Sequence, residues 1–214
     1  MKKIILILAF ILTILDISAQ DIKLPACDTT CPSLSVLDAL KTRHSVRSFN
    51  KLRSLSLQQL SNLCWAACGT TRNGGFRTAP TAMNKQEIRL FIFSSKGVYE
   101  YIADKNLLKC YQKGDYRKLV AGVQGQRIQE FVLDAPISLV IIIDLEKYGN
   151  QSEQAIRMGC VDAGNVSQNI NLFCQATGLA TVPRATMDSK AICKLLRLND
   201  KQIPIMNNPV GYEQ

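Results

Sequence analysis

The spacing of apolar residues along the chain predicts five helices. In each of them apolar side chains recur every three or four residues, the spacing that places them on one face of a helix. The second is the best delimited, because Ser56 to Gln59 has the capping-box pattern and Gly69 supplies a stop. The five predicted helices cover residues 34–42, 57–68, 117–133, 155–176 and 189–196.

A second set of segments has the composition and length of β-strands. The run Ile137–Ile143 is apolar except at Ser138 and rich in β-branched residues, which predicts a central strand covered on both faces. Shorter strands bounded by turn residues are expected at 88–93, 98–101, 107–111, 179–182 and 203–210. Together these elements predict an α+β layered domain in which helices pack against one mostly antiparallel sheet.

The chain begins with the pattern of a secretory signal peptide. Two lysines precede an apolar run that ends near Gln20, and the uncharged part of that run is too short to span a bilayer. We therefore expect residues 1–20 to be removed and the protein to be exported to a bacterial periplasm, with no stable membrane span. Residues 21–33 then form an irregular lead-in, and residues 34–214 form one domain.

The net positive charge of the chain indicates which class of ligand it binds. Removal of the signal peptide lowers the formal net charge only from +9 to +8, a balance that suits an anionic ligand or surface. The alternative is a basic protein whose Lys and Arg residues lie on solvated faces. Because no basic helix carries interleaved aromatic residues, nucleic acid is not expected as a partner.

Eight cysteines in an exported chain suggest disulfides or a metal. A local bridge between Cys27 and Cys31 is one alternative for the lead-in. Cys64 and Cys68 share a predicted helix face, where the geometry rarely suits a bridge. Zinc is not expected, because His44 is the only histidine. Small buried side chains are expected at Cys110, Cys160, Cys174 and Cys193.

The first of three polar clusters lies between the first two predicted helices. Arg43, Ser45 and Arg47 alternate along a segment without helical period, so in an extended loop their side chains point the same way. Two guanidinium groups and a hydroxyl are the groups that bind a phosphate monoester. The alternative interpretation is a solvated basic loop.

The other two clusters suit a planar heterocycle. Thr81, Asn84 and Gln86 lie in or next to a long loop from Asn73 to Lys85 and offer a hydroxyl and two amides. An amide can both donate and accept, as a carbonyl and imide edge requires. An ordinary capped loop is the alternative there. The third cluster, Gly178 to Thr186, is a strand that ends in small residues, where a backbone N–H can approach a ring.

In this order the clusters resemble the FMN-dependent nitroreductase superfamily. Arg43-His44-Ser45-Val46-Arg47 is similar to its phosphate loop, and Pro80-Thr81-Ala82-Met83-Asn84-Lys85-Gln86 is similar to its Pro-Ser-x-x-Asn-x-Gln signature. Asp162-Ala163-Gly164 resembles its dimerisation helix, and Pro209-Val210-Gly211-Tyr212 resembles its closing strand. The stretch from Leu63 to Gly69 looks most like the SagB/ThcOx-like branch, the azoline dehydrogenase type.

The resemblance implies a nitroreductase-like layered fold, FMN as cofactor, and a domain-swapped-style homodimer whose two subunits share each flavin. The residues it implies at the FMN phosphate and ribityl chain are Arg43, His44, Ser45 and Arg47. Those implied to reach the flavin from the other subunit are Pro80, Thr81, Ala82 and Asn84. Those implied to place a backbone N–H at the flavin N5 are Pro183, Arg184, Ala185 and Thr186. No metal and no side-chain nucleophile are implied.

The activity implied is a ping-pong oxidoreductase reaction through N5. A donor reduces FMN and leaves, and a small organic acceptor then takes the electrons. NAD(P)H is a reductant of the cytoplasm. An exported protein is therefore expected to receive electrons from an extracytoplasmic redox partner, with NAD(P)H as the alternative donor. Arg184 stands where relatives commonly have a glycine or an acidic residue, so a more basic and narrower pocket is expected. A peptide azoline oxidase and a non-catalytic flavin-binding or interaction protein remain open.

Overall fold

The computed structural model describes residues 20–123, 125 and 128–214. The expected signal peptide, apart from its last residue, lies outside the described residues. Within the described ranges no helix has both the length and the apolar character needed to cross a bilayer.

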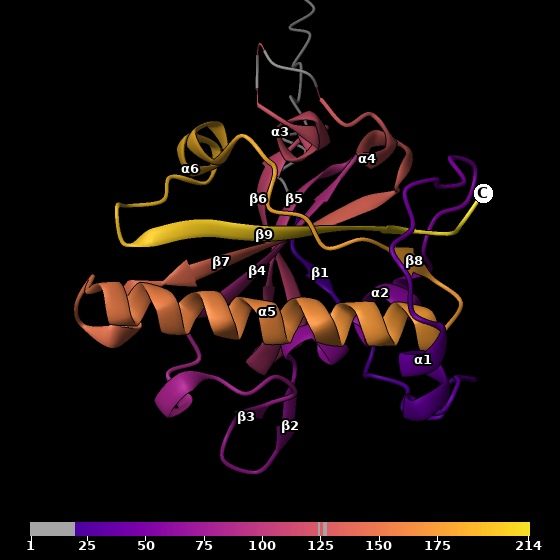
Figure 1. Ribbon diagram of the computed structural model, residues 1–214, viewed down its shortest axis with the longest axis horizontal. Helices are drawn as coiled ribbons and strands as arrows, with labels where there is room; N and C mark the ends of the chain where they lie inside the picture. The colour runs from indigo at the N-terminus through magenta and orange to yellow at the C-terminus, as the bar shows by residue number, and fades with distance from the viewer. Residues whose placement is uncertain (1–19, 124, 126–127) are drawn as a thin grey trace, which may run out of the picture.

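A seven-stranded sheet organises the domain (Figure 1). The strands lie in the order β1-β6-β5-β4-β7-β9-β8, and the pairings between neighbours are antiparallel, which confirms the expected sheet type. The lead-in is not wholly irregular, because it contributes the edge strand β1. The strands are β1 (Ile22–Lys23), β4 (Ile88–Ser94), β5 (Gly97–Ile102), β6 (Leu107–Lys113), β7 (Ile137–Asp144), β8 (Ala180–Thr181) and β9 (Gln202–Gly211).

Helices cover both faces of this sheet (Figure 1). On one face lie α1 (Val36–Thr42), α2 (Leu57–Cys68) and the long α5 (Glu153–Ala176); on the other lie α3 (Arg117–Ala121), α4 (Phe131–Asp134) and α6 (Ser189–Leu196). Side chains of successive strand residues point to opposite faces. Along β4, Leu90 and Ile92 therefore enter the core beneath α2 and α5, whereas Phe91 and Phe93 enter the opposite core.

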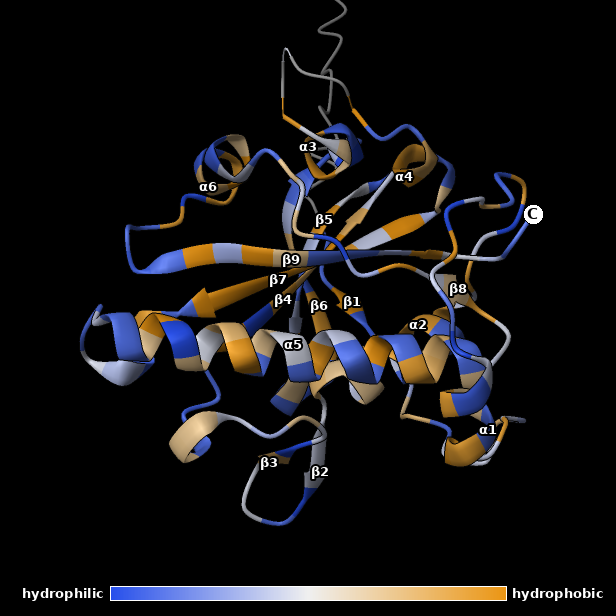
Figure 2. Cartoon of the chain, in the orientation of Figure 1, coloured by the Kyte–Doolittle hydropathy of each residue, from blue (hydrophilic) through white to orange (hydrophobic). Residues whose placement is uncertain are grey.

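The apolar run of β7 is buried along its whole length. All eight of its residues are buried, and Figure 2 shows the strand coloured hydrophobic. The reason is its place inside the sheet, between β4 and β9 and under helices on both faces. The predicted covering of both faces is confirmed.

Three further local expectations are wrong. The helix expected at 117–133 is broken into α3 and α4, because Gly122 leaves the helix with an extended backbone and Gly125 takes a φ of 83°. The long loop contains a small hairpin, β2 (Thr70–Arg72) and β3 (Phe76–Arg77), closed by glycines with positive φ. The third concerns Cys160, which is exposed on α5 rather than buried.

All eight cysteines are free thiols, and they differ in how deeply they are buried. Cys64, Cys68 and Cys174 are buried, as expected of small apolar side chains, whereas Cys110 and Cys193 are partly exposed and not buried as expected. Cys27 and Cys31 are also free in this structure. Burial raises the pKa of Cys27 to about 11, and the nearby Cys31 adds to the shift.

Helix α1 forms where it is predicted, but its apolar stripe faces outward. Ser35 caps the helix by accepting a hydrogen bond from the Asp38 N–H at 3.1 Å. Ala39 is buried, whereas the apolar side chains on the other side of the helix are exposed. Their exposed fractions are 70% for Val36, 77% for Leu37 and 51% for Leu40. An apolar surface of this kind marks a site of interaction.

Candidate functional site

The first polar cluster forms an extended segment alongside β8. Val46 is buried, and its N–H donates to the Thr181 carbonyl at 3.0 Å. The flanking Ser45 and Arg47 are therefore exposed, as the alternation predicts. Among the described residues, the side chains of Arg43, Ser45 and Arg47 have no hydrogen-bond or ion-pair partner. Their donors are available to an anion from outside the chain.

His44 is held by contacts that the sequence pattern does not reveal. Its Nδ1 lies 3.1 Å from the Thr42 carbonyl oxygen, and its Nε2 lies 3.8 Å from a carboxylate oxygen of Glu213. Glu213 reaches this position because it forms a β-bridge with Phe49. The C-terminal segment therefore borders the first cluster, at a sequence distance that no local motif indicates.

The segment Pro183–Thr186 is fixed to β9 through Arg184. The Arg184 N–H donates to the Asn207 carbonyl at 2.8 Å, and the Asn207 N–H donates back at 2.7 Å. Proline has no N–H to offer. Ala185 and Thr186 are exposed, and their N–H groups have no partner among the described residues. These two residues are the backbone donors that the segment can present to a ligand.

The Arg184 side chain turns inward rather than into solvent. Only 7% of the residue is exposed, and its guanidinium donates solely to neutral oxygens within the described chain. The acceptors are the carbonyls of Val120 (3.0 Å) and Ala121 (3.2 Å) and the side-chain oxygens of Gln129 (3.1 Å) and Asn207 (2.6 Å). Burial, followed by repulsion from Arg47, lowers the pKa of Arg184 to about 10.

A hollow of about 830 Å³ adjoins this guanidinium. Among the described residues it is lined by the four that run from Ile128 to Phe131. Gln129 accepts from Arg184, and the guanidinium carbon lies 5.7 Å from the centre of the Phe131 ring. That ring stacks on Phe49 at 6.3 Å between centroids. Arg184 therefore connects the third polar cluster to the wall of this hollow, and the first cluster lies beside the third through the bond from Val46 to Thr181.

The residues around the hollow include four that sequence reasoning missed. Residues 128–131 lie within the stretch predicted as a single helix, so nothing marked them as a wall of the site. Gly122 and Gly125 are the available signal, because two glycines within four positions weaken a helix prediction.

The second cluster lies elsewhere in the same chain. Its turn η1 (Ala82–Asn84) is bound to Asp162 in the N-terminal half of α5, whereas the first cluster follows α1, where Thr42 accepts from Gln175 near the end of α5. Thirteen helical residues span about 20 Å. Figure 1 shows the same separation, with η1 and β8 toward opposite ends of α5. One chain therefore does not bring the three clusters together.

The η1 turn has an unusual backbone. Met83, Asn84 and Gln86 have φ values of 52°, 51° and 51°, a left-handed conformation that costs energy for residues with a side chain. Several hydrogen bonds hold it, and two of them run from backbone N–H groups to side chains. The Ala82 N–H donates to a carboxylate oxygen of Asp162 at 2.7 Å, and the Gln86 N–H donates to the Thr81 hydroxyl at 3.0 Å.

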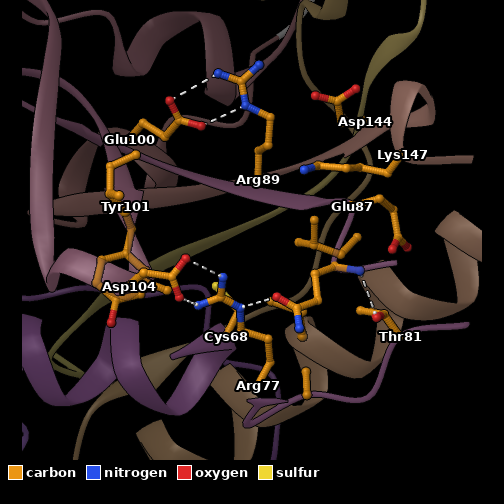
Figure 3. A pocket seen from close by; sticks show the side chains of 16 residues that line it. Cys68, Arg77, Thr81, Glu87, Arg89, Glu100, Tyr101, Asp104, Asp144 and Lys147 are labelled. Carbon is orange, nitrogen blue, oxygen red and sulfur yellow. Dashed lines mark hydrogen bonds and ion pairs between the residues drawn. The ribbon is translucent and has the colours of Figure 1, made fainter. Parts of the chain in front are cut away.

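A second hollow, of about 310 Å³, lies beside this turn (Figure 3). Its charged groups are largely matched within the chain. Arg89 and Glu100 form an ion pair at 2.7 Å, and Arg77 and Asp104 form another at 2.9 Å. Figure 3 shows Glu87 on the opposite side, with its carboxylate turned away from both pairs. The paired charges make this hollow a weaker candidate for an anionic ligand than the first.

Comparison with known proteins identifies the family. A model of the nitroreductase family matches residues 40–212. The chain belongs to the nitroreductase family. The match spans all three polar clusters, so the segments singled out in the sequence lie inside the domain of this nitroreductase-family oxidoreductase.

Relatives of this nitroreductase-family protein cover nearly its whole length. A Methanocaldococcus jannaschii protein named provisionally as a nitroreductase is 27% identical, over 90% of this chain and 96% of its own. A crystal structure of a provisionally named nitroreductase from Ralstonia eutropha is 28% identical, with a TM-score of 0.81 over 92% of this chain and 91% of that one. A Staphylococcus epidermidis structure, provisionally named an NAD(P)H:FMN oxidoreductase, shares the fold at 15% identity, with a TM-score of 0.64 over 87% and 91%.

Proposed function

We propose that the protein binds FMN and is a ping-pong oxidoreductase that passes electrons from a donor to a small organic acceptor. The observation that carries this proposal is that the first and third polar clusters lie side by side, with Arg47 close enough to Arg184 to lower its pKa. Among the described residues, Arg43, Ser45 and Arg47 offer donors without a partner, and the buried Arg184 adds a cation without a carboxylate partner.

The chemistry of this donor set fits FMN. A phosphate monoester carries a charge of about −1.5 to −2 near neutral pH and accepts charge-assisted hydrogen bonds from guanidinium groups. Arg47 and Arg184 repel each other in the chain alone. A bound anion offsets that repulsion, because its negative charge attracts both guanidinium groups. Family members typically bind FMN, which supports the same cofactor for this chain.

Each group of residues has a separate task in the proposed site. FMN supplies hydride transfer at its N5 atom when it is bound. Arg43, Ser45 and Arg47 hold the phosphate end. The free N–H groups of Ala185 and Thr186 are the candidates to donate at the ring, and backbone donors fixed in advance need no reorganisation during reaction.

A homodimer is part of the proposal. The residues Pro80, Thr81, Ala82 and Asn84 lie about 20 Å along α5 from the first cluster, and a second copy of the chain brings them to its neighbour's flavin. The exposed stripe on α1 and Val161 on α5, which is 61% exposed, supply the apolar surface that such an interface buries.

The electron donor is proposed to be an extracytoplasmic redox partner, because we also propose that the chain is exported. NAD(P)H is the competing donor. The SagB-like branch is the subfamily we favour, on the motif from Leu63 to Gly69. A flavin-binding protein without turnover is the competing function, and the experiment below separates it from the enzyme.

The deciding experiment is an absorption spectrum after reconstitution with FMN, followed by anaerobic titration with NADH, then with candidate reductants, then with dithionite. Retained flavin bands that NADH or another physiological reductant bleaches, and that a nitroaromatic or quinone restores, support the enzyme. Bands bleached only by dithionite identify a binder without turnover. Failure to retain FMN overturns the proposal.

A further inference from the structure

Glu87 is a buried acid without a hydrogen-bond donor. The residue has no exposed surface, and neither carboxylate oxygen has a donor among the described residues. Its backbone carbonyl accepts from the Asp144 N–H at 2.9 Å, which fixes the start of β4. Buried polar groups in folded proteins nearly always have a partner, so an orphaned carboxylate calls for an explanation.

The groups beside Glu87 explain why its carboxylate has no donor. Its side chain lies against the Asp162 carboxylate on α5 and the Tyr148 hydroxyl on η3 (Leu145–Tyr148). Burial raises the pKa of Glu87 to about 7, the interaction with Asp162 adds to the shift, and the neighbouring Tyr148 hydroxyl opposes it. Two carboxylates can form a hydrogen bond only when one of them carries a proton. A protonated Glu87 finds its acceptor in Asp162, whereas an ionised Glu87 faces a second negative charge.

Asp162 connects this pair to the strained turn. One of its oxygens accepts the Ala82 N–H at 2.7 Å and lies 3.5 Å from the Tyr148 hydroxyl. The residues that follow include Met83 and Asn84, whose backbones are left-handed. Strained backbone persists only where the surroundings hold it. The bond from Ala82 to Asp162 is the contact that ties this turn to α5.

We propose that Glu87 and Asp162 are a positioning pair for the turn from Thr81 to Gln86, holding it in place through one shared proton. The inference rests on the proposed function in one respect, that this turn serves the flavin of the other subunit. Neither residue is proposed to touch the cofactor. Their task is to keep the Ala82 N–H, and with it the left-handed turn, in a fixed place.

The pair makes the turn sensitive to pH. Loss of the shared proton leaves two buried negative charges in contact, and the chain relieves them by releasing the Ala82 bond. The charged and titratable groups that surround Glu87 are Asp162 on α5, Tyr148 and Lys147 on η3, Asp144 on β7 and Arg89 on β4. Arg89 is engaged by Glu100 at 2.7 Å. The turn is therefore expected to be ordered below about pH 7 and looser above it.

Hydrogen exchange of the cofactor-free protein tests the pair directly. Peptides containing the Ala82 amide are followed by mass spectrometry at about pH 6 and about pH 8.5, with correction for the intrinsic exchange rate. We expect protection of this segment to fall roughly tenfold across that range. Glu87→Gln keeps a neutral donor at every pH, so its protection is expected to stay high at both values.

A second variant changes Asp162, the other member of the pair. In Asp162→Asn the amide oxygen still accepts from Ala82, and the amide N–H can donate to an ionised Glu87. Protection is expected at both pH values in this variant too. The control is Glu153→Gln, which changes an exposed carboxylate on the same helix and is expected to behave as the unaltered protein.

The outcomes distinguish the inference from the proposed function. Equal protection at both pH values in the unaltered protein, or an unchanged fall in both Glu87→Gln and Asp162→Asn, overturns the positioning pair. Neither result depends on FMN. If the pair passes this test and FMN titration at the same two pH values shows no binding, the proposed function fails while the pair stands.

Discussion

The Arg184 guanidinium donates to the side-chain oxygen of Asn207 at 2.6 Å, and the same two residues exchange a pair of backbone hydrogen bonds. This double connection joins the Pro183–Thr186 segment to β9, in the interior of the domain. The remaining guanidinium donors reach the carbonyls of Val120 and Ala121 and the side-chain oxygen of Gln129, so one side chain links segments that are remote in sequence.

Arg184→Met is therefore expected to destabilise the fold. It leaves Val120, Ala121 and Asn207 with unsatisfied acceptors, and an orphaned buried group costs about 1–3 kcal/mol. We expect a loss of about 2–4 kcal/mol in the free energy of unfolding, measured by urea denaturation. Arg157→Met, which removes an exposed arginine paired with Glu153, serves as control and is expected to change little. A loss no larger than that of the control would contradict the structural role of Arg184.

Arg47→Ala is expected to weaken FMN binding. The substitution removes a charge-assisted contact worth about 1.5–3 kcal/mol, equivalent to roughly 10- to 100-fold in Kd. Fluorescence titration with FMN measures the effect. Lys51→Ala, which removes a nearby exposed cation paired with Asp134, is the matched control. Unchanged affinity in Arg47→Ala would remove the first cluster from the phosphate site.

Asn84→Ala is expected to act on the flavin held by the other subunit. Mixed dimers of Arg47→Ala and Asn84→Ala chains test this, because a shared site places both defects in one site and leaves the other intact. We expect such dimers to bind about one FMN with the affinity of the unaltered protein. If both residues serve a site within one chain, each site carries one defect and no tight site remains.

The exposed stripe of α1 is expected to lie in the dimer interface. Leu37→Glu places a charge where the proposed interface buries apolar surface, so the variant is expected to sediment as a monomer in analytical ultracentrifugation. Leu52→Glu changes a leucine that is 96% exposed in a loop outside α1, and it is expected to leave the dimer intact. A monomeric unaltered protein would refute the proposed assembly.

Overall stability is expected to fall as pH rises through about 7. The folded-state pKa of Glu87 is raised from its ordinary 4.5 to about 7, so the folded state binds a proton that the unfolded chain has already lost. The favourable contribution is complete below about pH 4.5 and is lost as pH passes the folded pKa. Between about pH 5.5 and pH 8.5, Tm is expected to fall less in Glu87→Gln than in the unaltered protein. An equal fall in both would show that another group controls the response.

The elements best predicted from the sequence are those whose signal is local. The capping box of Ser56 and Gln59 marks the start of α2, and the largely apolar run of β7 marks a strand inside the sheet. Alternation around Val46 likewise indicates which side chains of the first cluster face outward. Hydrogen bonds to near neighbours and the period of side-chain burial decide these features, so a short stretch of residues is enough to predict them.

Contacts between distant segments decided the rest. The sequence by itself determined most of the helices and strands and the three polar clusters, because each depends on neighbouring residues. Only the tertiary structure placed Glu87 against Asp162, turned Arg184 inward to Asn207 and left the α1 stripe exposed. The physical reason is that the energy of a buried charge or an apolar face depends on what packs against it, and in each case that partner lies far away along the chain.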